Sequence, residues 1–313
     1  MEKQMLRKLL FCFSFFFILQ TMNINAQVED SIETDDEEYF EDDDSWDWNW
    51  DWEDHWGHWE KGKPTIEISY GLGEAQHDKL KSNLAKVGLT EIKLGYASMD
   101  DDEGMVNEFN ERYGFISRIT TSLQSDKAAG SELSSDLLRF GFGKRSGYCY
   151  NFGQVRILPY NENSAVWSKL EMKDYPVGIA YNSNDAVNDT EILQRFDKEF
   201  RFGTLAEGGI RFELGHLISF NAGYETAVIF PRHMFWKHLG SFAIEAAGLN
   251  VIDNFVDEVF DSSPAATPIV NFLLKNGFSY AFYTLKKENM NWPFKTESPL
   301  TYETFKFGVT FTF

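Results

Sequence analysis

The segment from Glu213 to Ser219 has the residue types closest to a hydrolytic site. His216 follows a glycine, Ser219 comes three residues later, and Glu213 precedes both. A serine that a carboxylate-oriented histidine deprotonates is a nucleophile for hydrolysis. Gly215-His216, however, separates two alternating apolar segments, as a hairpin turn would, and no Gly-x-Ser-x-Gly motif occurs. The sequence therefore favours turn residues here. We predict no catalytic residue, and we favour a protein that is not an enzyme.

Two acidic segments carry side chains that cations use as ligands. Asp100 to Gly104 contains four consecutive acidic residues, and residues 28–60 contain sixteen Asp or Glu with no Lys or Arg. Carboxylates together with the nearby His55 and His58 suit hard or borderline metals. Neither segment, however, has EF-hand or zinc-ligand spacing. We therefore predict no metal site and no cofactor, and we interpret Asp100 to Gly104 as a solvated loop.

Residues 27–62 form a leader of unusual composition. Trp46, Trp48, Trp50 and Trp52 alternate there with acidic and amide residues. Like charges at this density repel one another, so the leader is predicted to be disordered. Three interpretations stay open. The leader binds a cationic or envelope partner, its tryptophans lie at a membrane–water interface, or it is a linker without a specific partner.

The first 26 residues have the composition of a secretory signal peptide. Three basic residues precede an apolar run of about eleven residues, Leu9 to Leu19, and Ile24-Asn25-Ala26 follows as a cleavage site. The run is too short to cross about 30 Å of hydrocarbon as a helix. Only Cys149 then remains in the mature chain, which excludes an intramolecular disulfide. No phosphate-binding glycine loop and no basic patch for nucleic acid occur.

From Pro64 onward the chain consists of short segments in which apolar residues occupy every second position, as strands require. The clearest hairpin is Gly209 to Tyr224. The chain ends on a strand with one strongly apolar face, whose members are Phe305, Phe307, Val309, Phe311 and Phe313. The opposite face of this strand is small or polar, so only one face needs an apolar medium.

A C-terminal strand of this kind resembles the last strand of bacterial outer-membrane β-barrel proteins. The resemblance implies that its aromatic face contacts outer-membrane lipid and that the strand is the signal read by the barrel-assembly machinery. It also implies an antiparallel up-and-down transmembrane barrel over residues 63–313, located in the outer membrane after export. The rest of the chain supports the resemblance only through its alternating pattern.

Eleven segments qualify as strands, and since such barrels have an even number we predict ten to twelve. The less regular predictions are a helix over Asp78 to Val87, a tight turn at Arg145 to Gly147 and a strand over Phe278 to Leu285. Apolar residues at helical spacing predict a helical insertion near residues 235–275.

Charged and amide residues opposite the apolar faces should line the lumen. They are Lys93, Arg139, Arg211, Glu213, Asn221 and Glu225. Because small barrels are filled by side chains, pairing among these groups argues against a wide pore. We therefore predict a structural or binding barrel, or one that passes a small solute. The alternatives are a lipid hydrolase at the barrel rim and a soluble periplasmic β-sandwich that binds a ligand.

Overall fold

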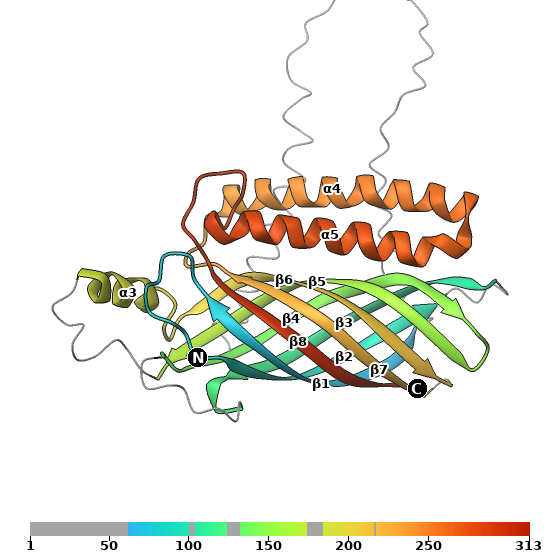
Figure 1. Ribbon diagram of the computed structural model, residues 1–313, viewed down its shortest axis with the longest axis horizontal. Coiled ribbons are helices and arrows are strands. Elements are labelled where there is room, and N and C mark those ends of the chain that lie inside the picture. The colour runs from blue at the N-terminus through green and yellow to red at the C-terminus, as the bar shows by residue number, and fades with distance from the viewer. Residues whose placement is uncertain (1–61, 100–103, 124–131, 174–183, 216) are drawn as a thin grey trace, which may run out of the picture. The chain divides into compact units, whose positions relative to one another are not determined.

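The computed structural model describes residues 62–99, 104–123, 132–173, 184–215 and 217–313. Within these residues, eight antiparallel strands pair in chain order and close into a barrel (Figure 1). The strands are β1 (Lys63–Gln76), β2 (Val87–Met99), β3 (Val106–Thr120), β4 (Ser135–Asn151), β5 (Val155–Met172), β6 (Phe200–Leu214), β7 (Ile218–Ile229) and β8 (Leu300–Thr312). The predicted signal peptide, nearly all of the acidic leader, His216 and residues 100–103 lie outside the described residues.

The last strand closes the barrel. β8 pairs with β7 on one side and with β1 on the other, where Ile68 lies opposite Val309 and Tyr70 opposite Phe307. The backbone N–H of Phe313 donates to the carbonyl of Pro64 at 3.0 Å. Every edge is therefore paired, which removes the exposed strand edges of an open sheet. The all-β, up-and-down barrel architecture is confirmed.

Alternation along each strand separates an apolar outer surface from a polar interior. The outward residues of β1, β2 and β8 are large and apolar, with Ile68 56%, Leu94 58% and Phe307 59% exposed. Their neighbours in the sequence point inward, and Glu67 and Lys306 are each 2% exposed. The terminal residues Phe305, Phe307, Val309, Phe311 and Phe313 all lie on the outward face or at its end. A soluble protein would show the reverse distribution.

The two ends of the barrel differ. At the short-turn end, residues 152–154 and 215–217 connect neighbouring strands, and β1 begins and β8 ends there. The opposite end, called here the long-loop end, carries residues 77–86, 121–134, 173–199 and 230–299. A short helix, α3 (Asn184–Gln194), belongs to this end and lies at the left of Figure 1. One turn of 3-10 helix (Thr121–Leu123) follows β3.

A helical hairpin lies along the outside of the barrel. It consists of α4 (Phe235–Ser262), a 3-10 turn (Pro264–Ala266) and α5 (Thr267–Glu288). The two helices run side by side along the wall, and α5 contacts β4, β5, β6 and β7 (Figure 1). α4 has 28 residues and is therefore about 42 Å long. Among the described residues, no helix is long and apolar enough to cross a membrane.

The predicted number of strands was wrong for three physical reasons. β4 continues through Arg145 to Gly147, because Arg145 points into the lumen and does not form a turn. β6 joins two segments that were counted separately, 196–203 and 210–214. Residues 278–285 belong to α5, since their aromatic residues face both the barrel and α4. The insertion is helical as predicted but extends to Glu288, and residues 78–87 contain no helix.

Candidate functional site

The lumen contains an ion-pair network. Within the described residues it joins six glutamates to five cations, namely Glu67, Glu91, Glu111, Glu162, Glu207, Glu225, Lys93, Arg139, Arg145, Arg211 and Lys306. Each of these side chains is at most 4% exposed. Isolated charges would be too costly at such burial, so each must have a partner of opposite sign.

Arg145 on β4 is the centre of the part of the network nearer the short-turn end. Its Nη1 atom lies 2.8 Å from Glu67 Oε2 and 2.9 Å from Glu111 Oε2, and its Nη2 lies 2.8 Å from Glu162 Oε2. Arg211 Nη2 donates to the same Glu111 oxygen at 2.7 Å. These contacts join five strands, so the side chains meet across the lumen.

Lys306 on β8 is the centre of the other part. Its ammonium donates to Glu91 Oε1 at 2.6 Å, Glu207 Oε2 at 2.8 Å and Glu225 Oε2 at 3.0 Å. Arg139 Nη1 also donates to Glu225, at 2.7 Å. The terminal strand therefore has two roles in the fold, because its outward face is aromatic and its inward face holds this cation.

Apolar side chains close both ends of the network. At the long-loop end, Ile192, Leu193 and Phe196 from α3 and the residues after it pack with inward residues of the strands. Asp189 fixes α3 there by accepting bonds from the Ser82 backbone N–H and hydroxyl, both at 2.7 Å. At the short-turn end, Phe109 and its neighbours form a second apolar cluster. The lumen is therefore packed along its length.

The structure places the six predicted lumen residues as follows. Lys93, Arg139, Arg211 and Glu225 belong to the network, and Asn221 is hydrogen-bonded to it, donating to Glu67 Oε2 at 2.9 Å. Glu213 also faces inward but lies near the short-turn end, where its Oε2 is 3.6 Å from Arg156 Nη1. Ser219, considered above as a nucleophile, is 2% exposed.

The prediction missed seven network members, although they show the same alternation along their strands. Glu67, Glu91 and Lys306 occupy inward positions in strands that were correctly recognised. Glu111, Glu162 and Glu207 lie in strands whose limits were not recognised, and Arg145 was assigned to a turn. Listing every charge on the polar side of each strand would have found the first three.

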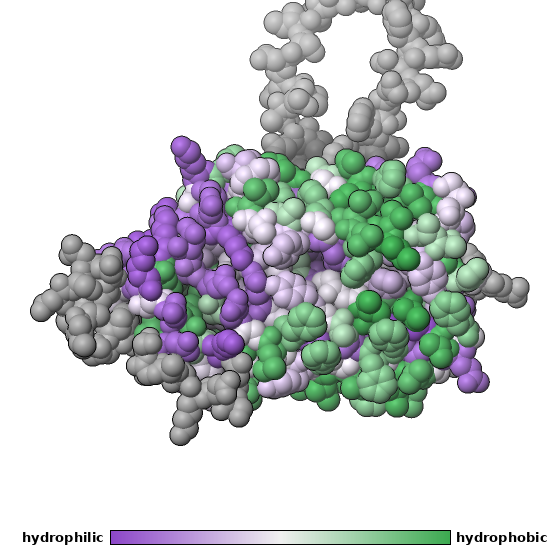
Figure 2. Space-filling model, in the orientation of Figure 1, coloured by the Kyte–Doolittle hydropathy of each residue, from purple (hydrophilic) through white to green (hydrophobic). Residues whose placement is uncertain are grey.

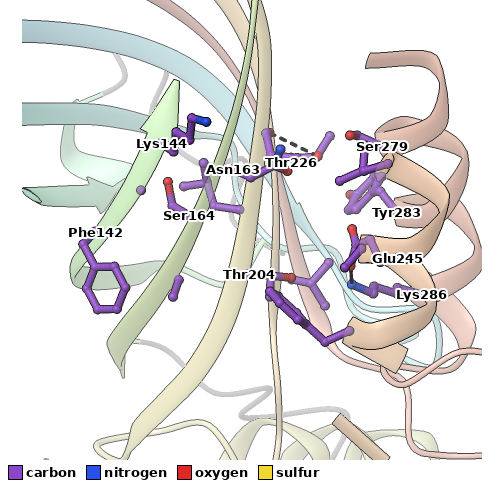
Figure 3. Close-up of a pocket in the computed structure, with 18 of the residues that line it drawn as sticks. Phe142, Lys144, Asn163, Ser164, Thr204, Thr226, Glu245, Ser279, Tyr283 and Lys286 are labelled. Atoms are coloured by element: carbon purple, nitrogen blue, oxygen red, sulfur yellow. Dashed lines mark hydrogen bonds and ion pairs between the residues drawn. The ribbon is translucent and has the colours of Figure 1, made fainter. Parts of the chain in front are cut away.

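A second candidate site lies outside the lumen, between the barrel wall and the helical hairpin. This lateral cavity has a volume of about 560 Å³ and is lined by β3 to β7 and by both long helices (Figure 3). Outward residues of the wall form its floor, with Lys144, Asn163, Ala206 and Thr226 in one row across four strands. The next row towards the long-loop end is less polar and includes Phe142 and Ala165.

The hairpin supplies the roof of the lateral cavity. α4 contributes Phe242 and Leu249, and α5 contributes Ser279, Tyr283 and Lys286. Lys286 Nζ lies 2.6 Å from Glu245 Oε2, so this cation is already paired. Close packing holds the roof in place beside the cavity, where Asn276 donates to the carbonyl of Tyr160 at 3.1 Å.

Comparison with solved structures finds several matches at low sequence identity. Neisserial surface protein A (NspA) is 10% identical with a TM-score of 0.39, and the match covers 80% of this chain and 97% of that one. Ail, the attachment invasion locus protein of Yersinia pestis, is 8% identical with a TM-score of 0.33, covering 80% and 99%. Ail in complex with the heparin analogue sucrose octasulfate gives 10% identity and the same TM-score and coverage. No family model and no curated protein matches the sequence.

Proposed function

We propose that the protein is a closed, non-conducting outer-membrane β-barrel whose function is carried by its outer surfaces. The observation that supports this most strongly is the ion-pair network, because Lys93, Arg145 and Lys306 each bridge strands across the lumen. A solute would have to separate several buried ion pairs to pass, and breaking one such pair costs about 3–5 kcal/mol. A structural or binding role is therefore favoured over passage of a small solute.

The distribution of apolar side chains supports the membrane location. Figure 2 shows hydrophobic residues gathered over the hairpin and the barrel wall near the short-turn end, and hydrophilic residues over the long-loop end. Exposed apolar residues of α4 and α5, such as Val251, Phe255 and Leu273, extend this surface across the hairpin. In outer-membrane barrels the short turns face the periplasm and the long loops face outward. We assign the two ends of this barrel in the same way.

The alternatives have less support. The predicted β-sandwich alternative was wrong, because the strands close into one barrel with a charged interior. A rim-located hydrolase would need a serine that substrate can reach, and Ser219 faces the barrel interior.

Two measurements test the proposal. Fractionation followed by electrophoresis with and without boiling should place the chain in the outer membrane with heat-dependent mobility. Conductance across a planar bilayer should then stay at the baseline of the protein-free membrane. Recovery as a soluble protein would overturn the membrane location. Steady single-channel conductance from the wild-type chain would overturn the closed lumen.

A further inference from the structure

We infer that the lateral cavity binds a free fatty acid, with the carboxylate near Lys144 and the acyl chain between the barrel wall and the helical hairpin. This inference rests on the membrane location proposed above, since the ligand would enter from lipid. It does not depend on whether the lumen conducts. The argument has three parts, which concern the volume of the cavity, its charge and an unpartnered hydroxyl group.

The cavity has the volume and composition of a small-molecule site. Its volume of about 560 Å³ lies within the 300–1,000 Å³ typical of ligand pockets. Most of its surface is apolar, and it opens beside Phe142 and Phe242, which are 46% and 60% exposed. An acyl chain would cover these rings and replace the solvent or lipid that otherwise contacts them.

Lys144 gives the cavity a positive end. It is an exposed cation on the outward face of β4, and no carboxylate of the described residues lies within ion-pair distance of it. Two acidic groups of the hairpin are already paired, Asp253 with Lys275 at 2.5 Å and Glu245 with Lys286 at 2.6 Å. A charge without a partner of opposite sign at a membrane-embedded surface costs free energy. An anionic headgroup would offset that cost.

Ser279 on α5 supplies an independent indication of a ligand. Its side chain is 5% exposed, and its hydroxyl has no hydrogen-bond partner among the described residues. Figure 3 shows this hydroxyl pointing into the cavity, near the same end as Lys144 and Asn163. A buried hydroxyl without a partner costs free energy, which a bound carboxylate oxygen would recover by accepting a hydrogen bond from it.

The order of residues along the wall sets the direction of the ligand. The row with Lys144 and Asn163 is polar, whereas Phe142 and Ala165 in the next row, and Phe202 beyond, are apolar. A chain with its carboxylate at Lys144 would therefore extend towards the long-loop end, beneath α4. A phospholipid has two chains and a larger headgroup, which a cavity of this volume disfavours.

The test uses the full chain folded in neutral maltoside micelles and confirmed by its heat-dependent mobility. Carboxyl-labelled ¹³C palmitate is titrated and followed by NMR, and native mass spectrometry counts the bound molecules. We expect one saturable site, with palmityl alcohol binding about tenfold more weakly because it lacks the charge. Lysophosphatidylglycerol, as the lipid source of a similar anion, should not displace palmitate at equal concentration.

Three variants make the test specific. Lys144→Gln should weaken palmitate binding about tenfold and leave the alcohol unchanged. Lys169→Gln is the matched control, because Lys169 also faces outward, on β5, but does not line the cavity. Ala246→Trp, at an exposed position of α4 that lines the cavity, should abolish binding by filling it.

Several results would overturn the inference. They are no saturable palmitate binding by folded protein, equal binding of acid and alcohol, an unchanged affinity in Lys144→Gln, or displacement by the lysophospholipid. Failure to obtain heat-modifiable protein would instead count against the membrane location.

Discussion

Lys93 Nζ on β2 lies 3.7 Å from Glu207 Oε2 on β6, although three strands separate β2 from β6 in either direction around the barrel. Lys93 Nζ is also 2.5 Å from Glu162 Oε1 on β5. The side chains of opposite walls thus meet near the axis. Buried ion pairs therefore fill the interior of this barrel. The stability of the fold should depend on each buried charge keeping a partner of opposite sign.

Removal of one central cation tests that dependence. Arg145→Met keeps much of the side-chain volume but leaves Glu67, Glu111 and Glu162 with fewer partners. We expect a loss of about 3–5 kcal/mol in the free energy of unfolding. Reversible urea unfolding in lipid vesicles, followed by tryptophan fluorescence, measures it.

Arg118→Met is the matched control for the Arg145 variant. Arg118 also pairs with a carboxylate, Asp136, but its side chain is 59% exposed on the outer surface. Water and salt screen an exposed pair, so its removal should cost much less than the Arg145 change. Equal effects of the two substitutions would contradict a central role for the lumen network.

Alternation along the strands made much of this fold predictable. Period-two patterns identified the outward aromatic residues of β8 and the inward Lys93 and Arg211, because one face of each strand must be apolar. The limits of β4 and β6 could not be found in this way. Outward positions of β4 hold Lys144 and Ser146, and those of β6 hold Thr204, Ala206 and Gly208, so the apolar pattern is interrupted within both strands.

The lateral cavity was beyond the reach of sequence reasoning. Asn163, Ala206 and Thr226 look like weak strand residues, because outward positions of a membrane barrel should be apolar. They are small or polar because α5 covers that part of the wall. Tertiary packing decides which strands α5 covers. The sequence pattern of the helix or of a strand alone does not reveal this contact.

The contact between the hairpin and the wall gives a second prediction. A Cβ atom on Gly208 of β6 would lie 2.6 Å from Asn276 Oδ1 of α5. Gly208→Leu should therefore push α5 away from the wall, at a cost of about 1–3 kcal/mol, while the barrel stays closed. Hydrogen exchange measured by mass spectrometry should become faster in α5 and stay unchanged in β1 and β2.

Gly114→Leu is the control for crowding at the hairpin. Gly114 also faces outward, on β3, but a Cβ there meets only the Gly141 carbonyl at 3.8 Å. Its substitution should leave exchange in α5 unchanged. If Gly208→Leu exchanges like wild type throughout, the hairpin does not depend on this close contact.

The terminal aromatic residue gives a third prediction, about assembly. Phe313 is 64% exposed and follows the last residue of β8. Phe313→Asp should lower the amount of barrel recovered from outer membranes at least several-fold, if the terminal strand is the assembly signal. The same variant refolded in vitro should keep nearly all of its stability, because the side chain makes few contacts within the chain. Phe313→Tyr, which keeps an aromatic ring, should assemble normally.

The two readouts of the Phe313 variants separate assembly from folding. Loss of both cellular recovery and in vitro stability would mean that Phe313 supports the fold directly. Normal recovery of Phe313→Asp would contradict a role for this residue in the assembly signal.

A fourth prediction concerns pH at the long-loop end. Burial lowers the pKa of His77, which contacts the edge of the Phe196 ring at a centroid distance of 6.0 Å. Asp78 opposes this shift of the pKa, whereas Lys79 and Arg195 favour it. In the folded state His77 therefore binds a proton less readily than it does in the unfolded loop. The packing of His77 against Phe196 keeps its full stability above a pH of about 6.5 and loses stability as the pH falls below that value.

Hydrogen exchange can follow the opening of this loop directly. After correction for intrinsic rates, residues 77–86 and α3 should exchange faster at pH 5 than at pH 7.5, while the strands keep their protection. His77→Leu retains an apolar contact with Phe196 but cannot be protonated, so its exchange should lose most of this pH dependence. If the variant and the wild type respond to pH alike, another group controls the long-loop end, and the buried position of His77 would then only add packing to the apolar cluster.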